Sequence, residues 1–158
     1  MKSTLLVTLL TLYATQAAAL SCMEASIAQQ FIWAKESPDR FVIVKGQMQV
    51  QDSTKKTLSK DIENDTELYG YRAQITGMSL SKQGFVSRFT SPVLLELSCI
   101  HGWCGSLPDA RERIYFLKKD KNRYIEHAGA CDFSLDRAPS AKNVQILQRC
   151  ISGGPCKP

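Results

Sequence analysis

The sequence predicts an all-β protein: one small, strongly curved β-barrel with a short helix near each end. About five segments have the alternation or the β-rich composition of strands, and they are unevenly spaced along the chain. Glycines interrupt two of these segments, at Gly46 and Gly77, as expected where a strand bends. No repeat or low-complexity linker divides the chain, and its 158 residues suit one domain.

Residues 1–21 have the three parts of an export signal. Lys2 supplies the positive charge, an apolar run extends from Thr4 to Ala14, and the small-residue stretch "TQAAALS" follows. This run is too short to span a bilayer, which takes about 20 residues. Cleavage after Ala19 and cleavage after Ser21 both remain open, and acylation of Cys22 is a third alternative. We expect a secreted or periplasmic protein, and a lipoprotein only if Cys22 is acylated.

The mature part, residues 22–158, is expected to form a single domain held by disulfides. All six cysteines lie in it, and an even number of cysteines behind an export signal indicates three bridges in an oxidising compartment. Sequence alone allows 15 pairings of six cysteines. The net charge of +5 is too small to indicate nucleic-acid binding.

The N-terminal half predicts a helix and then a bent strand. Apolar side chains at roughly helical spacing over residues 27–34 predict a short helix. In the following stretch, "RFVIVKGQMQVQD", the apolar positions change parity at Gly46, which suggests a β-bulge. Residues 51–68 are polar without clear period and are expected to form a long loop or an extended hairpin tip.

The C-terminal half predicts the remaining strands and a second helix. Alternation in "LYGYRAQITGMSLS" places Tyr71, Ala73 and Ile75 on one face. The strand "PVLLELSCI" follows, and "ERIYFLKKD" and "NRYIEHAGAC" form a hairpin. The stretch "VQILQRC" predicts a short helix that ends before "SGGPC".

These features occur in an order that resembles the netrin-like module. They are a cysteine near the mature N-terminus, a short helix, a long strand with a glycine, "YRAQITG", "WCG", "YFL", "ACDF" and a terminal helix with a cysteine. The family includes the inhibitory domain of the tissue inhibitors of metalloproteinases, and its fold is a five-stranded OB barrel. The "LSC" start and the tail "CISGGPCKP" are also similar to exported bacterial proteins of that type. The resemblance implies an OB-fold barrel over nearly all of the mature chain.

The resemblance also implies a set of disulfides. Cys104 in "WCGS" matches the inhibitor cysteine that bonds the N-terminal cysteine. Cys131 in "ACDF" matches the cysteine bonded to the third residue of the inhibitors' Cys-x-Cys. This chain has Cys22 alone at its start, so bridges from Cys22 to Cys104 and to Cys131 are alternatives. The set that we prefer is Cys22–Cys131, Cys99–Cys104 and Cys150–Cys156.

The function implied is that of an exported, non-enzymatic binding module. Its recognition surface is expected at one barrel end, which carries Cys22, Met23 and the loop with His101 and Trp103. In the inhibitor family the α-amine and carbonyl of the N-terminal cysteine chelate the protease zinc, and Met23 would enter the specificity pocket. Inhibition of a zinc metalloprotease is therefore one alternative to binding of another protein. It requires that the mature chain begin at Cys22.

A second alternative is attachment to an anionic polysaccharide or membrane surface. It would use a basic hairpin, which we define by Arg111, Arg113, Lys118, Lys119, Lys121 and Arg123.

No cofactor, metal or catalytic residue is expected. Cys99, His101, Cys104 and His127 form a nominal zinc set, but two cysteines so close together in an exported chain more often form a bridge. No phosphate-binding loop, nucleophile motif or acid–base carboxylate pair is present in the sequence.

Overall fold

The computed structural model describes residues 22–132 and 137–157; the predicted export signal lies outside this part. Its elements are α1 (Ile27–Glu36), β1 (Arg40–Asp61), β2 (Thr66–Ser81), β3 (Gly84–Ile100), β4 (Trp103–Cys104), β5 (Arg113–Asp120), β6 (Arg123–Ala128) and α2 (Ala141–Ile151). Five strands close a barrel in the order β2-β1-β5-β6-β3, since β3 also pairs with β2, and β4 is an extra strand beside β3. The β3–β6 pair is parallel and the other pairs are antiparallel. The predicted five-stranded OB-type barrel with flanking helices is confirmed.

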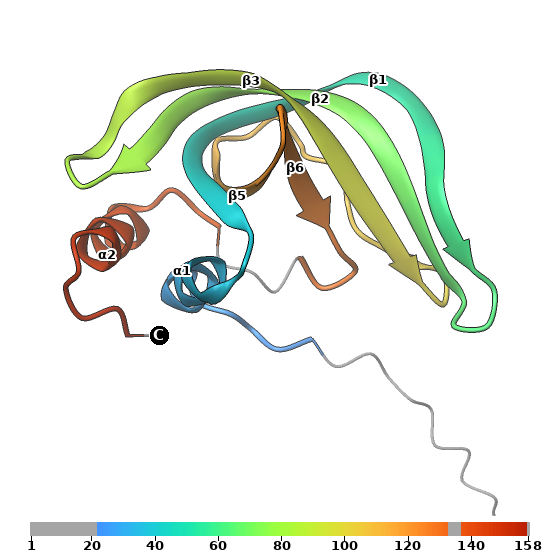
Figure 1. Ribbon diagram of the computed structural model, residues 1–158, viewed down its shortest axis with the longest axis horizontal. Coiled ribbons are helices and arrows are strands. Elements are labelled where there is room, and N and C mark those ends of the chain that lie inside the picture. The colour runs from blue at the N-terminus through green and yellow to red at the C-terminus, as the bar shows by residue number, and fades with distance from the viewer. Residues whose placement is uncertain (1–21, 133–136, 158) are drawn as a thin grey trace, which may run out of the picture.

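The first three strands are long, and they form an arch that continues beyond the barrel (Figure 1). Of the two alternatives for residues 51–68, the structure has the extended hairpin: β1 pairs with β2 as far as Asp61 and Thr66. The two helices lie together below the end of the arch that carries the β2–β3 turn (Figure 1). Ser26 and Ser140 cap them, because their hydroxyls accept bonds from the N–H groups of Gln29 and Asn143.

The predicted bulge at Gly46 is wrong. Gly46 pairs directly with Gly77, and the nearest shift in the β1–β2 register falls between Val50 and Asp52. The parity changes because both faces of β1 are buried near this point. Val44 faces the barrel interior, whereas Ile43 packs in a second core with residues of α1 and α2.

Three disulfides hold the chain, and they are the set preferred from the sequence. Cys22–Cys131 joins the segment before α1 to the segment after β6. Cys99–Cys104 closes the turn between β3 and β4, and Cys150–Cys156 fixes the chain after α2. Three bridges indicate an oxidising compartment. Neither helix in the described part of the chain has the length and apolar character needed to cross a membrane.

Candidate functional site

A cavity of about 400 Å³ opens at one end of the barrel. Its floor is Met48 and Leu95, which belong to the barrel core. Its rim is formed by two segments, residues 104–109 after β4 and residues 128–132 after β6. Polar groups from β5, β6 and the segment before α2 line it between floor and rim: the buried Tyr115 and Glu126 and the partly buried Arg137.

Both parts of the predicted recognition end, the segment at Cys22 and the loop that ends at Cys104 and Gly105, are linked to this rim. Cys104 lines the cavity, and Cys22 is bonded to Cys131, which precedes the lining residue Asp132. The two rim segments touch, because a Cβ on Gly105 would lie 2.1 Å from the carbonyl oxygen of Ala128. Cys104 therefore lines the cavity directly, whereas Cys22 is linked to its rim through Cys131.

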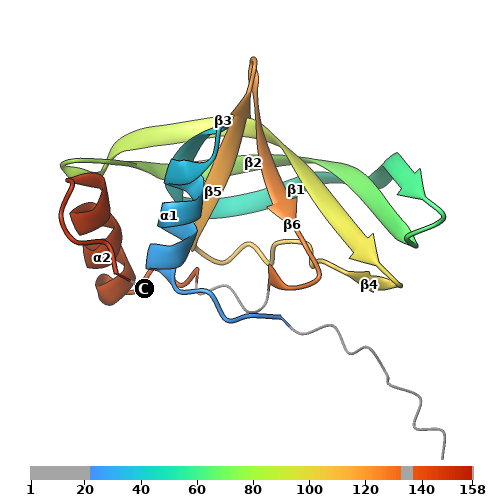
Figure 2. The ribbon, with the colours of Figure 1, turned by 60° about the horizontal axis from the view of Figure 1, so that its bottom comes forward.

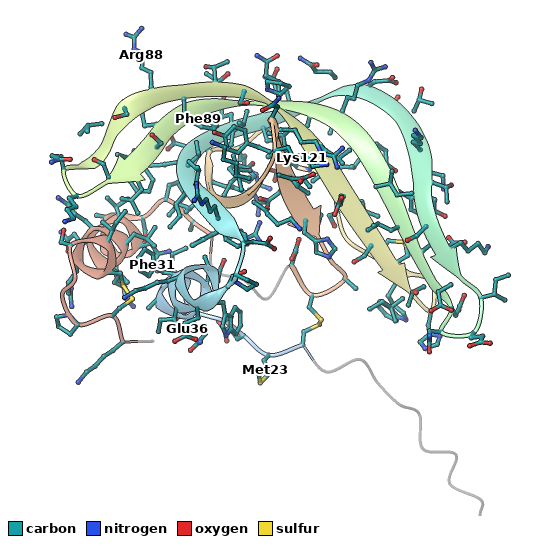
Figure 3. All side chains as sticks on the ribbon, viewed as in Figure 1. Met23, Phe31, Glu36, Arg88, Phe89 and Lys121 are labelled. Carbon is teal, nitrogen blue, oxygen red and sulfur yellow. A yellow bond between two sulfur atoms is a disulfide. The ribbon has the colours of Figure 1, made fainter. Side chains whose placement is uncertain are left out.

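The other predicted recognition residues are exposed and do not line the cavity. Met23 is 78% exposed and projects below the N-terminal segment beside α1 (Figure 3). Trp103 is 69% exposed, on the short strand β4 at the other side of the molecule (Figure 2). Sequence reasoning placed both in one recognition end, and the structure separates them into two exposed parts.

The turn that carries His101 and Trp103 is fixed to the β1–β2 turn. The backbone N–H of His101 donates to the carbonyl oxygen of Asp65 at 2.9 Å, and its Nδ1 lies 3.4 Å from Asp65 Oδ2. We call the exposed apolar residues of these two turns the apolar tip: Ile62, Ile100 and Trp103.

Inside the cavity, Glu126 and Arg137 form a buried ion pair. Burial raises the pKa of Glu126 to about 7; the Arg137 guanidinium opposes this shift, and the Asp132 carboxylate adds to it. Burial also raises the pKa of Tyr115 to about 12. Among the described residues, Glu126 Oε2, the Tyr115 hydroxyl and Arg137 Nε have no hydrogen-bond partner.

The sequence held a signal for one of these residues. On the strand "RYIEHA", Glu126 shares the inward face with Tyr124 and Ala128, which pack in or against the barrel core. A carboxylate at an inward position of an alternating strand is unusual and indicates a partnered or functional group. No pattern pointed to Arg137, since it lies between elements.

Most of the basic hairpin is neutralised by acidic neighbours. Asp109 Oδ2 lies 2.7 Å from Arg111 Nε and 3.1 Å from Arg113 Nη2, and Arg113, followed by Arg111, holds the pKa of Asp109 at about 2. Two further cations of the hairpin have partners, in the pairs Lys118–Asp39 and Arg123–Asp120.

The nominal zinc set does not assemble in this structure. Cys99 and Cys104 are bonded to each other, and a disulfide sulfur is not a thiolate ligand. His127 Nε2 instead lies 3.3 Å from Ser98 Oγ. Over residues 22–132 and 137–157, no three Asp, Glu, His or Cys side chains come together as metal ligands would.

The chain was compared with protein-family models, curated proteins and solved structures. No family model, no curated protein and no solved structure matches it.

Proposed function

We propose that this chain is an exported, non-enzymatic binding module of netrin-like type, which binds a partner protein through the apolar tip. The observation that carries the proposal is that Ile62, Ile100 and Trp103 are exposed on two turns that are joined to each other. Exposed apolar side chains in a group mark interaction surfaces, and Trp is favoured where binding energy concentrates.

The tip is rigid before it binds. The Cys99–Cys104 bridge closes the β3–β4 turn, and the backbone bond from His101 to Asp65 fixes that turn to its neighbour. Less conformational entropy is therefore lost on association than a flexible loop would lose.

The charges beside the tip favour a protein over an anionic surface. Asp61, Glu63, Asp65 and Glu67 surround the β1–β2 turn, and the cation beside them, Lys60, is paired with Glu67 at 2.6 Å. This acidic border repels phospholipid headgroups and polysaccharide acids, and it is complementary to a partner with a basic rim around an apolar pocket.

Site-specific photo-crosslinking in the native host tests the proposal. We expect a photoreactive phenylalanine analogue at position 103 to give one discrete crosslinked partner. Excess unlabelled wild-type protein should abolish this crosslinked product by competition. The Trp103→Ala protein should not compete. The control position is Val86, also exposed but near the β2–β3 turn. Equal crosslinking from both positions, or none from position 103, would contradict the proposal.

Metalloprotease inhibition is a second candidate, favoured by the Cys22–Cys131 bridge. The bridge fixes the position of Cys22, and the next side chain, Met23, is exposed. A chain that begins at Cys22 would hold its α-amine in a fixed position. That amine has a pKa near 7.7–8.0, so little free energy is needed to present it as a neutral zinc ligand near neutral pH.

The intact mass of the mature protein decides whether this candidate survives. We expect a chain that starts at Cys22, with an unmodified amine, to inhibit a zinc metalloprotease on titration. The matched control has one alanine added before Cys22 and should not inhibit. A native mass that starts at Leu20, or that includes an acyl group, would contradict the inhibitor function and leave binding at the apolar tip unaffected.

A further inference from the structure

The cavity at the barrel end has the form of a small-molecule site. Its volume of about 400 Å³ lies within the range of roughly 300–1,000 Å³ typical of ligand pockets. Met48 and Leu95 give it an apolar floor, and Leu107 and Pro108 give it an apolar rim. Polar and charged side chains line its walls, among them Tyr115, Glu126 and Arg137, and such groups fix the orientation of a ligand.

Three of its polar atoms lack a protein partner among the described residues, namely Glu126 Oε2, the Tyr115 hydroxyl and Arg137 Nε. Tyr115 is 3% exposed and Glu126 is 4% exposed. Neither the Tyr115 hydroxyl nor Glu126 Oε2 has a hydrogen-bond partner among the described residues. Leaving a buried polar group unpaired is unfavourable, so a molecule that bonds Glu126 Oε2 and the Tyr115 hydroxyl is favoured in this cavity.

The charges within the cavity are unequal. Glu126 and Asp132 are two carboxyl groups facing one guanidinium, that of Arg137. The third carboxyl group, Asp109, lies at the rim and is already paired with Arg111 and Arg113. Burial raises the pKa of both Glu126 and Asp132, because desolvation disfavours their charged forms and the Arg137 guanidinium offsets this only in part.

We propose that this cavity binds a primary ammonium group on a short apolar body, with the ammonium at Glu126 Oε2 and the Tyr115 hydroxyl and the apolar part over Met48 and Leu95. This site goes beyond the proposed function, because none of its residues belongs to the apolar tip. An ammonium has three donors and no acceptor, which matches the two unpaired atoms that can accept, Glu126 Oε2 and the Tyr115 hydroxyl; it does not pair the donor Arg137 Nε. It also adds a positive charge beside Glu126 and Asp132, which face the single guanidinium of Arg137.

Other ligand chemistries fit the cavity less well. A carboxylate or phosphate could accept from Arg137 Nε, but it would also lie beside the two carboxyl groups of Glu126 and Asp132, which repel it. An alcohol satisfies one acceptor but supplies no charge. An inorganic cation would require a set of oxygen ligands and waters, whereas the floor is apolar and no three-ligand cluster is present in the described chain.

Calorimetric titration of the oxidised, mature protein near pH 7 tests the site. The probes are n-hexylamine, 1-hexanol and hexanoate, which share one apolar chain and differ in the head group. We expect n-hexylamine to bind, 1-hexanol to bind at least about tenfold more weakly because a hydrogen bond to a charged group is lost, and hexanoate not to bind.

Two variants assign the contacts. Glu126→Gln should weaken n-hexylamine binding by at least about tenfold, and Tyr115→Phe should weaken it by several-fold. The matched controls, Glu96→Gln and Tyr124→Phe, remove the same atoms from residues that do not line the cavity and should bind as the wild type does. Thermal melts show which variants are folded. If Glu126→Gln does not fold, Tyr115→Phe still tests the site.

Binding should also release a proton. Near pH 7 Glu126 is partly protonated, with Arg137, Asp132 and Tyr115 facing it. An ammonium favours the carboxylate form, so the measured heat should depend on the ionisation enthalpy of the buffer. This dependence should be absent in Glu126→Gln.

The ammonium has two potential sources, a free amine and a lysine side chain of a partner. A peptide with one lysine, acetylated at its N-terminus, separates them: binding of n-hexylamine alone identifies a free amine, and binding of both identifies a lysine-bearing partner. The proposal is overturned if 1-hexanol binds as tightly as n-hexylamine, if Glu126→Gln and Tyr115→Phe bind n-hexylamine unchanged, or if neither amine probe binds at millimolar concentration.

Discussion

Glu126 on β6 and Arg137 before α2 form an ion pair whose side chains are only 5% and 16% exposed. The pair lies between two cavities, since both residues also line a second one of about 340 Å³ beside Trp33 of α1. Burial outweighs the attraction of the guanidinium and raises the pKa of Glu126 to about 7. The barrel thus carries, at its open end, a carboxyl group that titrates near neutral pH.

Glu126 should make the protein less stable as the pH rises. Between its ordinary pKa of 4.5 and about 7, the unfolded chain has released the proton of this carboxyl group while the folded chain retains it. The stabilisation is therefore fully present below pH 4.5 and is lost by about pH 7. We expect the free energy of unfolding of Glu126→Gln, relative to wild type, to rise by roughly 3 kcal/mol between pH 5 and pH 8.

Urea denaturation of both proteins at the two pH values measures this difference. Carboxylates with lowered pKa, such as Asp109, are present in both proteins and cancel. A constant difference between Glu126→Gln and wild type would mean that Glu126 is ionised throughout this range.

Gly46 and Gly77 allow β1 and β2 to approach closely where the two glycines pair. A Cβ on Gly46 would lie 2.3 Å from the carbonyl oxygen of Thr76, and one on Gly77 would lie 2.2 Å from that of Lys45. Either glycine-to-alanine substitution should lower the free energy of unfolding by about 3 kcal/mol, because the clash is with backbone. Gly129→Ala, whose Cβ would meet its nearest neighbour at 3.6 Å, should differ little from wild type in the same urea titration.

Sequence patterns predicted the strands well where one face of the strand was buried. Tyr71, Ala73 and Ile75 alternate with polar neighbours, and all three are buried. The patterns failed near Gly46, because α1 and α2 cover the outer face of β1 at Ile43. Apolar residues on both faces of β1 then give the sequence an apparent change of parity. Only the placement of the helices distinguishes a strand buried on both faces from a strand with a bulge.

The candidate site was less predictable than the fold, because distant segments build it. The family resemblance placed Cys22 and Cys104 near one end; Cys104 lines the cavity, and Cys22 is bonded to Cys131, which precedes the lining residue Asp132. The polar side chains inside the cavity come from β5, β6 and the segment before α2. Alternation alone cannot show that Tyr115, Glu126 and Arg137 meet, since the meeting depends on barrel closure.

The Cys22–Cys131 bridge should stabilise the fold more than the Cys150–Cys156 bridge. The first links residues 109 apart and the second links residues 6 apart. Loop-closure entropy then predicts losses of about 5 and about 2 kcal/mol when each pair is replaced by serine. Guanidinium denaturation of the two double variants checks the order; equal losses would show that the unfolded chain is not restricted by the longer loop.

Removing Asp109 should strengthen binding to polyanions. In the wild type this carboxylate neutralises Arg111 and Arg113, so the basic hairpin presents less positive charge than its sequence suggests. In Asp109→Asn both guanidiniums are released toward solvent, and we expect elution from a heparin column at higher salt than for wild type. Asp61→Asn is the matched control: it changes the net charge equally, but Asp61 bonds Asn64 and Glu63 rather than a cation. If wild type and Asp109→Asn eluted at the same salt concentration, the ion pairs with Asp109 would not weaken the binding of the basic hairpin to polyanions. Attachment to an anionic surface would then become the stronger functional hypothesis.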